Sequence, residues 1–392
     1  PRAVIGAPAA LLALSLAWTS PGPGIEYGRS ATTAPNGGPI KVHVLRIDRA
    51  ALGSRRVTVV LANGRTLHRQ RTSAMAHQNR AIVATNGAVC GALPPVSGDP
   101  IGIVIRDGRL ASEPIEGRAA LLVPRDPAAP PRIASLHFLG SATAGGRARV
   151  IDGIDRLRGF IPACGGRGGD RPTERPNGTL VCHDPSELIA YDRGFGERTR
   201  PAHDGLEVTV RDGKATGAHR GGSTPIPEDG YVLSGSGDAA SFLRRADDLA
   251  IDLAIDADGQ RIDAADFTAA LGGGPRLLRD GRTDIPRAAE GYAPPNDPGW
   301  GRRISDRNPR TMAGVDADGR LIMATVDGRQ PGYSVGLSYV EGAELMRSLG
   351  ARDAVNLDGG GSATMVIHGR VVNSPSDDEG ERPVADSLEV VP

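Results

Sequence analysis

Short runs of alternating or continuous apolar residues recur along the chain and predict β-strands. Residues 101–123 are expected to form hairpins around Asp107-Gly108, a dipeptide that favours tight turns. Two Asp-x-Asp-Gly runs lack the first and twelfth ligands of a calcium-binding loop and are predicted to be hairpin turns. The predicted strands before residue 90 are Lys41–Ile47, Arg56–Leu61 and Ala81–Thr85, and the two Asp-x-Asp-Gly runs are Asp256–Gly259 and Asp316–Gly319.

Three segments carry helix signals, and one of them is capped by Asp238 and runs to about Asp248. Thr72–Arg80 is predicted to be a short helix. Val340–Leu349 is the strongest prediction, because Ser338 and Glu341 have the spacing of a capping box and Gly350 supplies a left-handed stop. Strands and helices mix without strict alternation, which favours an α+β fold with a mixed β-sheet core and a few helices.

We expect a single large domain over residues 40–392. Residues 160–230 are the least regular part, because Gly165-Gly166-Arg167-Gly168-Gly169 suits neither a helix nor a strand interior. This segment is interpreted as an irregular surface insertion rich in Gly, Pro and Arg.

The N-terminal segment is apolar and uncharged from Val4 to Trp18. It is shorter than a membrane span and is interpreted as a signal peptide over residues 1–17, with Ser15-Leu16-Ala17 as the cleavage site. A buried N-terminal helix is the alternative. Residues 18–39 are rich in Pro, Gly, Ser and Thr and are predicted to be a linker. These features predict a secreted protein of the cell envelope or exterior, without stable membrane insertion.

Composition narrows the function further. The 46 basic and 46 acidic residues cancel, which argues against general nucleic-acid binding. Lysine occurs only at Lys41 and Lys214, so a bound phosphate or carboxylate would meet arginine guanidinium groups. No phosphate-binding loop or dinucleotide fingerprint is present, and no cofactor is expected. Residues Gly360 to Thr364 resemble a serine-hydrolase nucleophile elbow but lack its final glycine.

Three cysteines raise the question of a disulfide. In an exported chain, Cys164 and Cys182 can pair across the Gly-rich segment. A metal site formed by these two residues and His183 is the alternative, although it lacks paired C-x-x-C spacing. Cys90 is expected to be a small buried residue.

Charged residues and glycines gather at predicted strand ends in the C-terminal third. A glycine-rich turn can bind an anion through its N–H groups, arginines add charge, and a carboxylate can attack or transfer a proton. These residue types favour a phosphate-handling hydrolase, with ordinary turns and surface ion pairs as the alternative. The residues are Arg310, Thr311, Asp327, Arg329, Asp358, Gly359, Gly360, Gly361, Ser362 and Arg382.

The ordered motifs of this region resemble the phosphodiester glycosidases, the family of N-acetylglucosamine-1-phosphodiester α-N-acetylglucosaminidase. The resemblance covers residues 40–391 and is strongest after residue 308. It rests on Asn356–Val366, Val372–Ser376, Glu381–Ala385, Pro309-Arg310-Thr311, Val326–Arg329, Leu271–Pro275 and Asn86-Gly87.

The resemblance implies hydrolysis of a sugar-1-phosphodiester at its glycosidic bond, with a glycan or sugar-phosphate as substrate. Asp358 is the first candidate for the catalytic carboxylate and Asp327 the second. Asn86 would hold a sugar hydroxyl or amide. The three arginines, Thr311, the glycine turn and Ser362 would bind substrate.

Residues 88–90, Ala88-Val89-Cys90, depart from the glycine and aromatic usual in the family after Asn86-Gly87. This departure bears on the sugar preference, for which N-acetylglucosamine is the family default. A non-catalytic glycan-binding protein and a phosphodiesterase that cleaves the P–O bond are the alternative functions. The latter would normally use two metals, and no dense His/Asp cluster is present in the sequence.

Overall fold

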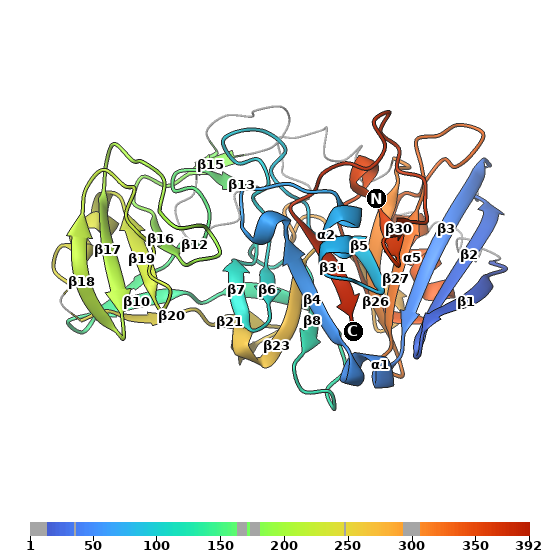
Figure 1. Ribbon diagram of the computed structural model, residues 1–392, viewed down its shortest axis with the longest axis horizontal. Coiled ribbons are helices and arrows are strands. Elements are labelled where there is room, and N and C mark those ends of the chain that lie inside the picture. The colour runs from blue at the N-terminus through green and yellow to red at the C-terminus, as the bar shows by residue number, and fades with distance from the viewer. Residues whose placement is uncertain (1–13, 35–36, 163–170, 173–180, 247, 293–305) are drawn as a thin grey trace, which may run out of the picture.

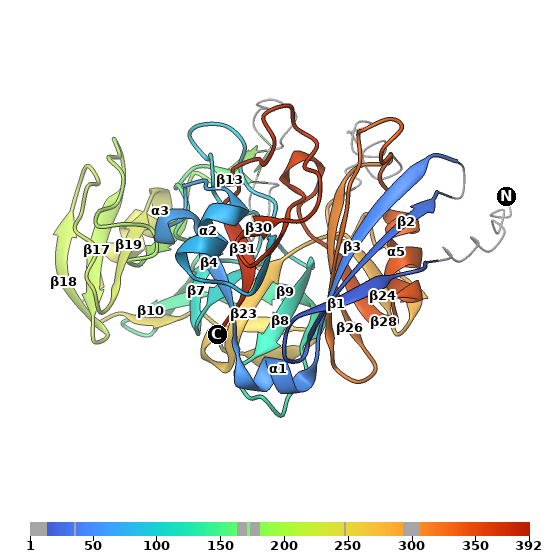
Figure 2. The ribbon, with the colours of Figure 1, turned by 45° about the vertical axis from the view of Figure 1, so that its right-hand side comes forward.

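The computed structural model describes residues 14–34, 37–162, 171–172, 181–246, 248–292 and 306–392. Figures 1 and 2 show a larger body with a smaller lobe at one end. The body contains three large antiparallel sheets, so the predicted β-sheet core with few helices is confirmed, and the chain is mostly β.

An eight-stranded antiparallel sheet forms one end of the body. Side chains along its strands alternate between two buried faces. In β27 (Leu321–Val326), Ile322 and Ala324 pack toward the helix α5 (Tyr339–Ser348), whereas Leu321 and Met323 pack toward the central core. In spatial order the strands are β1 (Ala17–Gly22), β2 (Ile25–Thr33), β3 (Pro39–Ile47), β27 (Leu321–Val326), β26 (Arg310–Asp316), β28 (Ala351–Asn356), β24 (Arg276–Arg279) and β25 (Arg282–Thr283).

Two further sheets enclose the central core with the eight-stranded sheet. All three contribute aliphatic side chains to one buried cluster, for example Leu45, Leu121 and Leu388. The five-stranded sheet is β30 (Arg370–Val371), β29 (Met365–Ile367), β5 (Val83–Asn86), β31 (Asp386–Val391) and β4 (Arg56–Leu61). The seven-stranded sheet is β22 (Gln260–Ile262), β21 (Ile255–Ala257), β9 (Arg132–Phe138), β8 (Ala119–Pro124), β23 (Phe267–Gly272), β6 (Val104–Arg106) and β7 (Arg109–Ser112).

The lobe corrects part of the predicted irregular insertion. Within residues 160–230, three strands between residues 188 and 219 belong to an ordered five-stranded sheet, which packs with α3 (Gly237–Leu243) against the seven-stranded sheet. The Gly-rich run at residues 165–169 lies outside the described residues. The buried Arg156 pairs with Glu113 of the body at 2.7 Å and with Glu187 of the lobe at 2.5 Å. The lobe strands are β12 (Gly153–Ile154), β16 (Leu188–Tyr191), β19 (Tyr231–Gly235), β17 (Leu206–Arg211) and β18 (Lys214–His219).

The segment 18–39 is also corrected, because it contains β1 and β2 where a linker was predicted. β2 pairs with the whole length of β3, from Ile25 opposite Ile47 to Thr33 opposite Pro39. Its buried positions include Gly28 and Ser30, which carry little or no apolar side chain. Backbone pairing therefore holds a strand whose composition resembles a linker. The predicted signal peptide lies mostly outside the described residues.

The remaining elements are short. Both Asp-x-Asp-Gly runs form the expected hairpin turns, between β21 and β22 and between β26 and β27. No helix in the described parts of the chain is long and apolar enough to span a membrane. The other elements are α1 (Arg49–Ser54), η1 (Ala62–Gly64), α2 (Thr72–Gln78), β10 (Ser141–Ala144), β11 (Arg147–Val150), β13 (Ile161–Pro162), β14 (Arg171–Pro172), β15 (Val181–His183), β20 (Ala250–Asp252), η3 (Ala264–Asp266) and η4 (Gly360–Ser362).

The capping box predicted at the start of α5 is confirmed. Glu341 N–H donates to the Ser338 hydroxyl oxygen at 3.2 Å, and Ser338 N–H donates to the Glu341 carboxylate at 2.9 Å.

We expect Ser338→Ala to lower the free energy of unfolding by about 0.5–2 kcal/mol, measured by urea denaturation. Val340→Ala, in the same turn but 51% exposed, should change it by less than about 0.5 kcal/mol. Equal losses in both variants would contradict a capping role.

Candidate active site

Strand ends from two sheets meet at one point of the body. β5 of the five-stranded sheet ends at Asn86, and Thr311 lies near the start of β26 in the eight-stranded sheet. β28, also in the eight-stranded sheet, ends two residues before Asp358. The fold therefore brings together candidate residues that are more than 200 positions apart in the sequence.

Asn86 joins the two sheets through its side-chain amide. Its Oδ1 accepts hydrogen bonds from the Thr311 hydroxyl at 2.7 Å and from Thr364 N–H at 3.0 Å. Its Nδ2 donates to the backbone carbonyl of Asp358 at 2.9 Å. The side chain is completely buried, so it positions Asp358 and leaves no exposed atom for the sugar contact expected from the sequence.

The glycines after Asp358 allow a tight turn against the loop that precedes β26. Gly360 N–H donates to the Pro309 carbonyl at 2.9 Å, and Gly360 has a φ of +62°. A Cβ atom on Gly359 would lie 2.6 Å from the same carbonyl oxygen. The close approach and the positive φ explain why the chain has glycine at both positions.

The Asp358 carboxylate lies at the base of this turn. Its Oδ1 accepts a hydrogen bond from Gly359 N–H at 2.9 Å, and the Ser362 side chain also hydrogen-bonds to it. Burial raises the pKa of Asp358 to about 6, and the two hydrogen bonds and the charges of Arg382 and Arg329 limit that rise. Near neutral pH the group is mostly ionised and can act as a base or nucleophile.

Two of the three candidate arginines flank the turn. Arg329 is exposed, and its guanidinium lies 3.0–3.2 Å from the position of a Cβ atom on Gly360. Arg382 binds both carboxylate oxygens of Asp377, at 2.7 and 2.9 Å. Both charges act on Asp358.

Arg310 is placed differently. It is 5% exposed, and its guanidinium donates to the backbone carbonyls of Leu337 and Asp306 and stacks 3.9 Å from the Tyr339 ring centroid. Desolvation lowers its pKa from the ordinary value. These contacts anchor the start of β26 to α5, and no carboxylate pairs with this guanidinium among the described residues.

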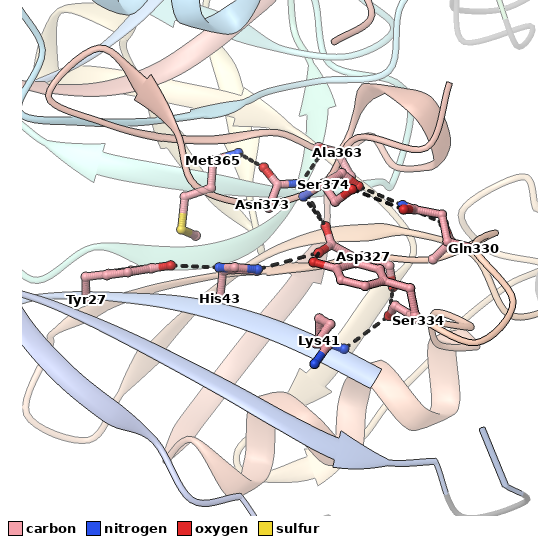
Figure 3. A network of polar contacts seen from close by, with 12 residues as sticks. Tyr27, Lys41, His43, Asp327, Gln330, Ser334, Ala363, Met365, Asn373 and Ser374 are labelled. Atoms are coloured by element: carbon pink, nitrogen blue, oxygen red, sulfur yellow. Dashed lines mark hydrogen bonds and ion pairs between the residues drawn. The ribbon is translucent and has the colours of Figure 1, made fainter. Parts of the chain in front are cut away.

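The second candidate carboxylate, Asp327, lies in a buried network (Figure 3). Its Oδ1 accepts hydrogen bonds from Asn373 Nδ2 at 3.0 Å and from Ser374 N–H at 2.9 Å. Its Oδ2 faces the Tyr333 hydroxyl at 3.3 Å and His43 Nε2 at 3.5 Å. The two contacts to Oδ1 come from residues 373 and 374, so Asp327 fixes the loop at these residues.

The same network extends through residues that sequence reasoning missed. His43 Nδ1 lies 2.8 Å from the Tyr27 hydroxyl. Asn373 also donates to the Ala363 carbonyl, which links Asp327 to the chain just after the glycine turn. Tyr27 and His43 lie on β2 and β3, far from any motif, so no local signal marks them.

Asp386 is another residue that sequence reasoning missed. It is fully buried at the start of β31, and its Oδ1 accepts a hydrogen bond from Ala88 N–H at 2.8 Å. Burial raises the pKa of Asp386 to about 7, and the charge of Asp358 contributes to the rise. Its position directly after the Glu381–Ala385 motif is the one available sequence signal.

Cys90 is half-buried near these two carboxylates and does not form a disulfide. Burial raises the pKa of its thiol to about 12, and the charges of Asp358 and Asp386 add to the rise. The disulfide predicted between Cys164 and Cys182, and the alternative metal site, involve residue 164, which lies outside the described residues. Within the described parts of the chain, no group of three or more His, Cys, Asp or Glu residues could hold a metal ion.

The buried Asp386 predicts a pH effect on stability. Its carboxyl pKa is about 7 in the folded protein and 3.8 ordinarily, so the folded state binds the proton more tightly. Stability from this group therefore falls as pH rises from about 4 to about 7. We expect Asp386→Asn, which keeps an oxygen for Ala88 N–H, to be more stable than wild type by about 2–4 kcal/mol at pH 8.

Chemical denaturation of both proteins at pH 4 and pH 8 measures this difference, which should nearly disappear at pH 4. Asp229→Asn, on an exposed loop, is the control and should show little pH-dependent gain. A gain for Asp386→Asn that is equal at both pH values would contradict the effect of the buried charge.

Comparison with known proteins identifies the family of this chain. Residues 204–391, which include both aspartates and the glycine turn, match the family described as phosphodiester glycosidase. The chain is 28% identical over 245 residues to mouse N-acetylglucosamine-1-phosphodiester alpha-N-acetylglucosaminidase, an alignment that covers 62% of this chain. It spans 43% of that mouse protein, which is less than half of its length.

Two solved structures share the fold. A protein of Burkholderia pseudomallei K96243 is 32% identical, with a TM-score of 0.79, over 92% of this chain and 76% of its own. A hypothetical protein from Synechocystis is 20% identical, with a TM-score of 0.73, over 96% of this chain and 64% of its own. The second likeness bears on the fold alone. On the family match over residues 204–391 and the similarity to the mouse enzyme, this protein belongs to the phosphodiester glycosidase family.

Proposed function

We propose that this protein hydrolyses the glycosidic bond of a sugar-1-phosphodiester and releases a free sugar and a phosphate monoester. The observation that carries the proposal is the Asp358 carboxylate held at a glycine turn between the charges of Arg329 and Arg382. A carboxylate for the sugar carbon and cations for the phosphate are the two requirements of this reaction.

The reaction needs little help from a general acid. When the bond between the sugar C1 and the bridging oxygen breaks, the bond's electron pair and the oxygen leave with the phosphate, which is a good leaving group. Arg329 and Arg382 would stabilise the charge that develops on it. Water supplies a hydroxyl to C1 and a proton that is released.

Asp358 would act on the sugar carbon, as a nucleophile or as a base for the attacking water. Asn86 and the Gly359 N–H fix its position, and its pKa of about 6 keeps it mostly ionised at neutral pH. Asp327 and Arg310 would act as positioning residues, because both carboxylate oxygens of Asp327 and the Nε and Nη2 atoms of Arg310 contact protein groups.

The substrate would be a glycan or sugar-phosphate, with N-acetylglucosamine as the default sugar. The mouse relative's name specifies an N-acetylglucosamine-1-phosphodiester, which supports that choice. Export is also proposed, on the apolar segment before residue 18 and on the Burkholderia protein, whose name suggests that it is exported.

Hydrolysis of sugar-1-phosphate methyl diesters in 18O-labelled water tests the reaction, with mass spectrometry of both products. We expect the label in the sugar, because the proposed attack is at carbon. Label in the phosphate would establish P–O cleavage and overturn the glycosidase mechanism. Binding without turnover of any diester would favour a non-catalytic glycan-binding protein.

Asp358→Asn tests the catalytic carboxylate. The amide cannot take a proton or attack carbon, so we expect kcat to fall about 10²- to 10⁴-fold while the unfolding temperature changes little. Asp353→Asn, on the preceding strand β28, is the matched control and should retain activity. Full activity of folded Asp358→Asn would remove this residue from the mechanism.

A further inference from the structure

A second carboxylate lies on the glycine turn. Asp377 belongs to a loop at residues 374–382, which Figure 1 shows in dark red at one edge of the body. A Cβ atom on Gly361 would lie 2.0 Å from Asp377 Oδ1 and 2.3 Å from Oδ2. Both carboxylate oxygens therefore rest against the turn, and Arg382 binds them with two hydrogen bonds.

The Asp377 carboxylate bound by Arg382 resembles a bound phosphodiester in its charge and its paired oxygens. A phosphodiester carries one negative charge shared by two non-bridging oxygens, and a carboxylate carries one charge shared by two oxygens. Both fit the paired donors of a guanidinium. Gly361 has no side chain, so either anion can approach this position closely.

The surrounding charges agree with a site for one anion. Arg329 lies over Gly360 on one side, and Arg382 holds Asp377 over Gly361 on the other. Among the described residues, Asp358 is the acid at the base of the turn. Glu381 points elsewhere, because its carboxylate accepts hydrogen bonds from the backbone and hydroxyl of Ser73 in α2.

Two features of the loop would allow Asp377 to leave Arg382. The Asp377 side chain is 30% exposed and that of Arg382 is 40% exposed, so neither is enclosed by packing. The hydroxyl of Ser376, the preceding residue, is shielded from solvent and has no hydrogen-bond partner among the described residues. An unpaired buried hydroxyl is costly, so a movement of the loop that gives it a partner would be favourable.

We propose that Asp377 occupies the phosphate position of the site and that the substrate phosphodiester displaces it from Arg382. This inference rests on the proposed function and names the anion that the site selects, a monoanionic diester that replaces one negative charge with another. The tethered carboxylate lowers the affinity for phosphate, because it competes for Arg382 until it is displaced.

Phosphate binding without turnover tests the proposal. The probe is dimethyl phosphate, a monoanionic diester without a sugar, titrated into wild type and variants by NMR. If Asp377 holds Arg382 about nine-tenths of the time, Asp377→Asn should bind the probe about tenfold more tightly than wild type. Asp378→Asn removes the same charge from an exposed position of the same loop and should change the affinity less than about twofold.

Each result separates the proposal from a simpler explanation. Equal tightening in both variants would show an effect of loop charge alone and overturn the proposal. Weaker binding by Asp377→Asn would show that Asp377 orients Arg382 for the ligand, which also overturns it. Adding Arg382→Gln to Asp377→Asn should abolish the gain, and unfolding temperatures check that all variants are folded.

The proposed hydrolysis can fail independently of this result. A protein that hydrolyses no sugar diester, but binds dimethyl phosphate more tightly after Asp377→Asn, would retain the anion exchange and lose the reaction. A protein that hydrolyses diesters, but shows no change in probe affinity after Asp377→Asn, would retain the reaction and lose the exchange.

Discussion

The buried amide of Asn86 is the contact on which the site depends. It accepts two hydrogen bonds and donates a third, and its partners Thr311, Thr364 and Asp358 belong to segments more than 200 residues away. An amide has a donor and an acceptor end, so it specifies one relative placement of the two sheets. Loss of the Asn86 amide would leave its buried partners with one hydrogen bond fewer. The position of the Asp358 backbone, and so of the turn after it, follows from this constraint.

The candidate residues around this contact fall into two groups. Asp327 and Arg310 bind other parts of the protein, and both hold segments that border the turn. Asp358, Arg329 and the ion pair of Asp377 with Arg382 carry the charges at the turn itself. Sequence motifs mark both kinds of residue equally, because an arginine that holds a backbone and an arginine that meets a ligand look alike in a sequence.

Local signals predicted local structure well. The capping box of α5 and the two Asp-x-Asp-Gly hairpins depend on neighbouring residues, and both are confirmed. The prediction of a linker over residues 18–39 was wrong. Pairing with β3 holds β2 in place, and its buried Gly28 and Ser30 add nothing to a hydrophobic pattern. The order of the lobe was missed because the Gly-rich run at residues 165–169 was extended to the whole of 160–230, whereas β16 to β18 lie between residues 188 and 219. Asp377 and Asp386 gain their importance from tertiary placement alone, which no spacing in the sequence encodes.

The distance in sequence between the partners of Asn86 has a consequence for biosynthesis. Thr364 lies 278 positions after Asn86, and β31, which pairs with β5, spans Asp386–Val391. Translation must therefore pass β31 before the site can assemble, because this strand pairs directly with the strand that ends at Asn86. A nascent polypeptide that stops before β31 would hold every glycine of the turn in its sequence and still lack a strand of the sheet that carries Asn86. Assembly of the site is therefore a late event relative to the synthesis of the first strands.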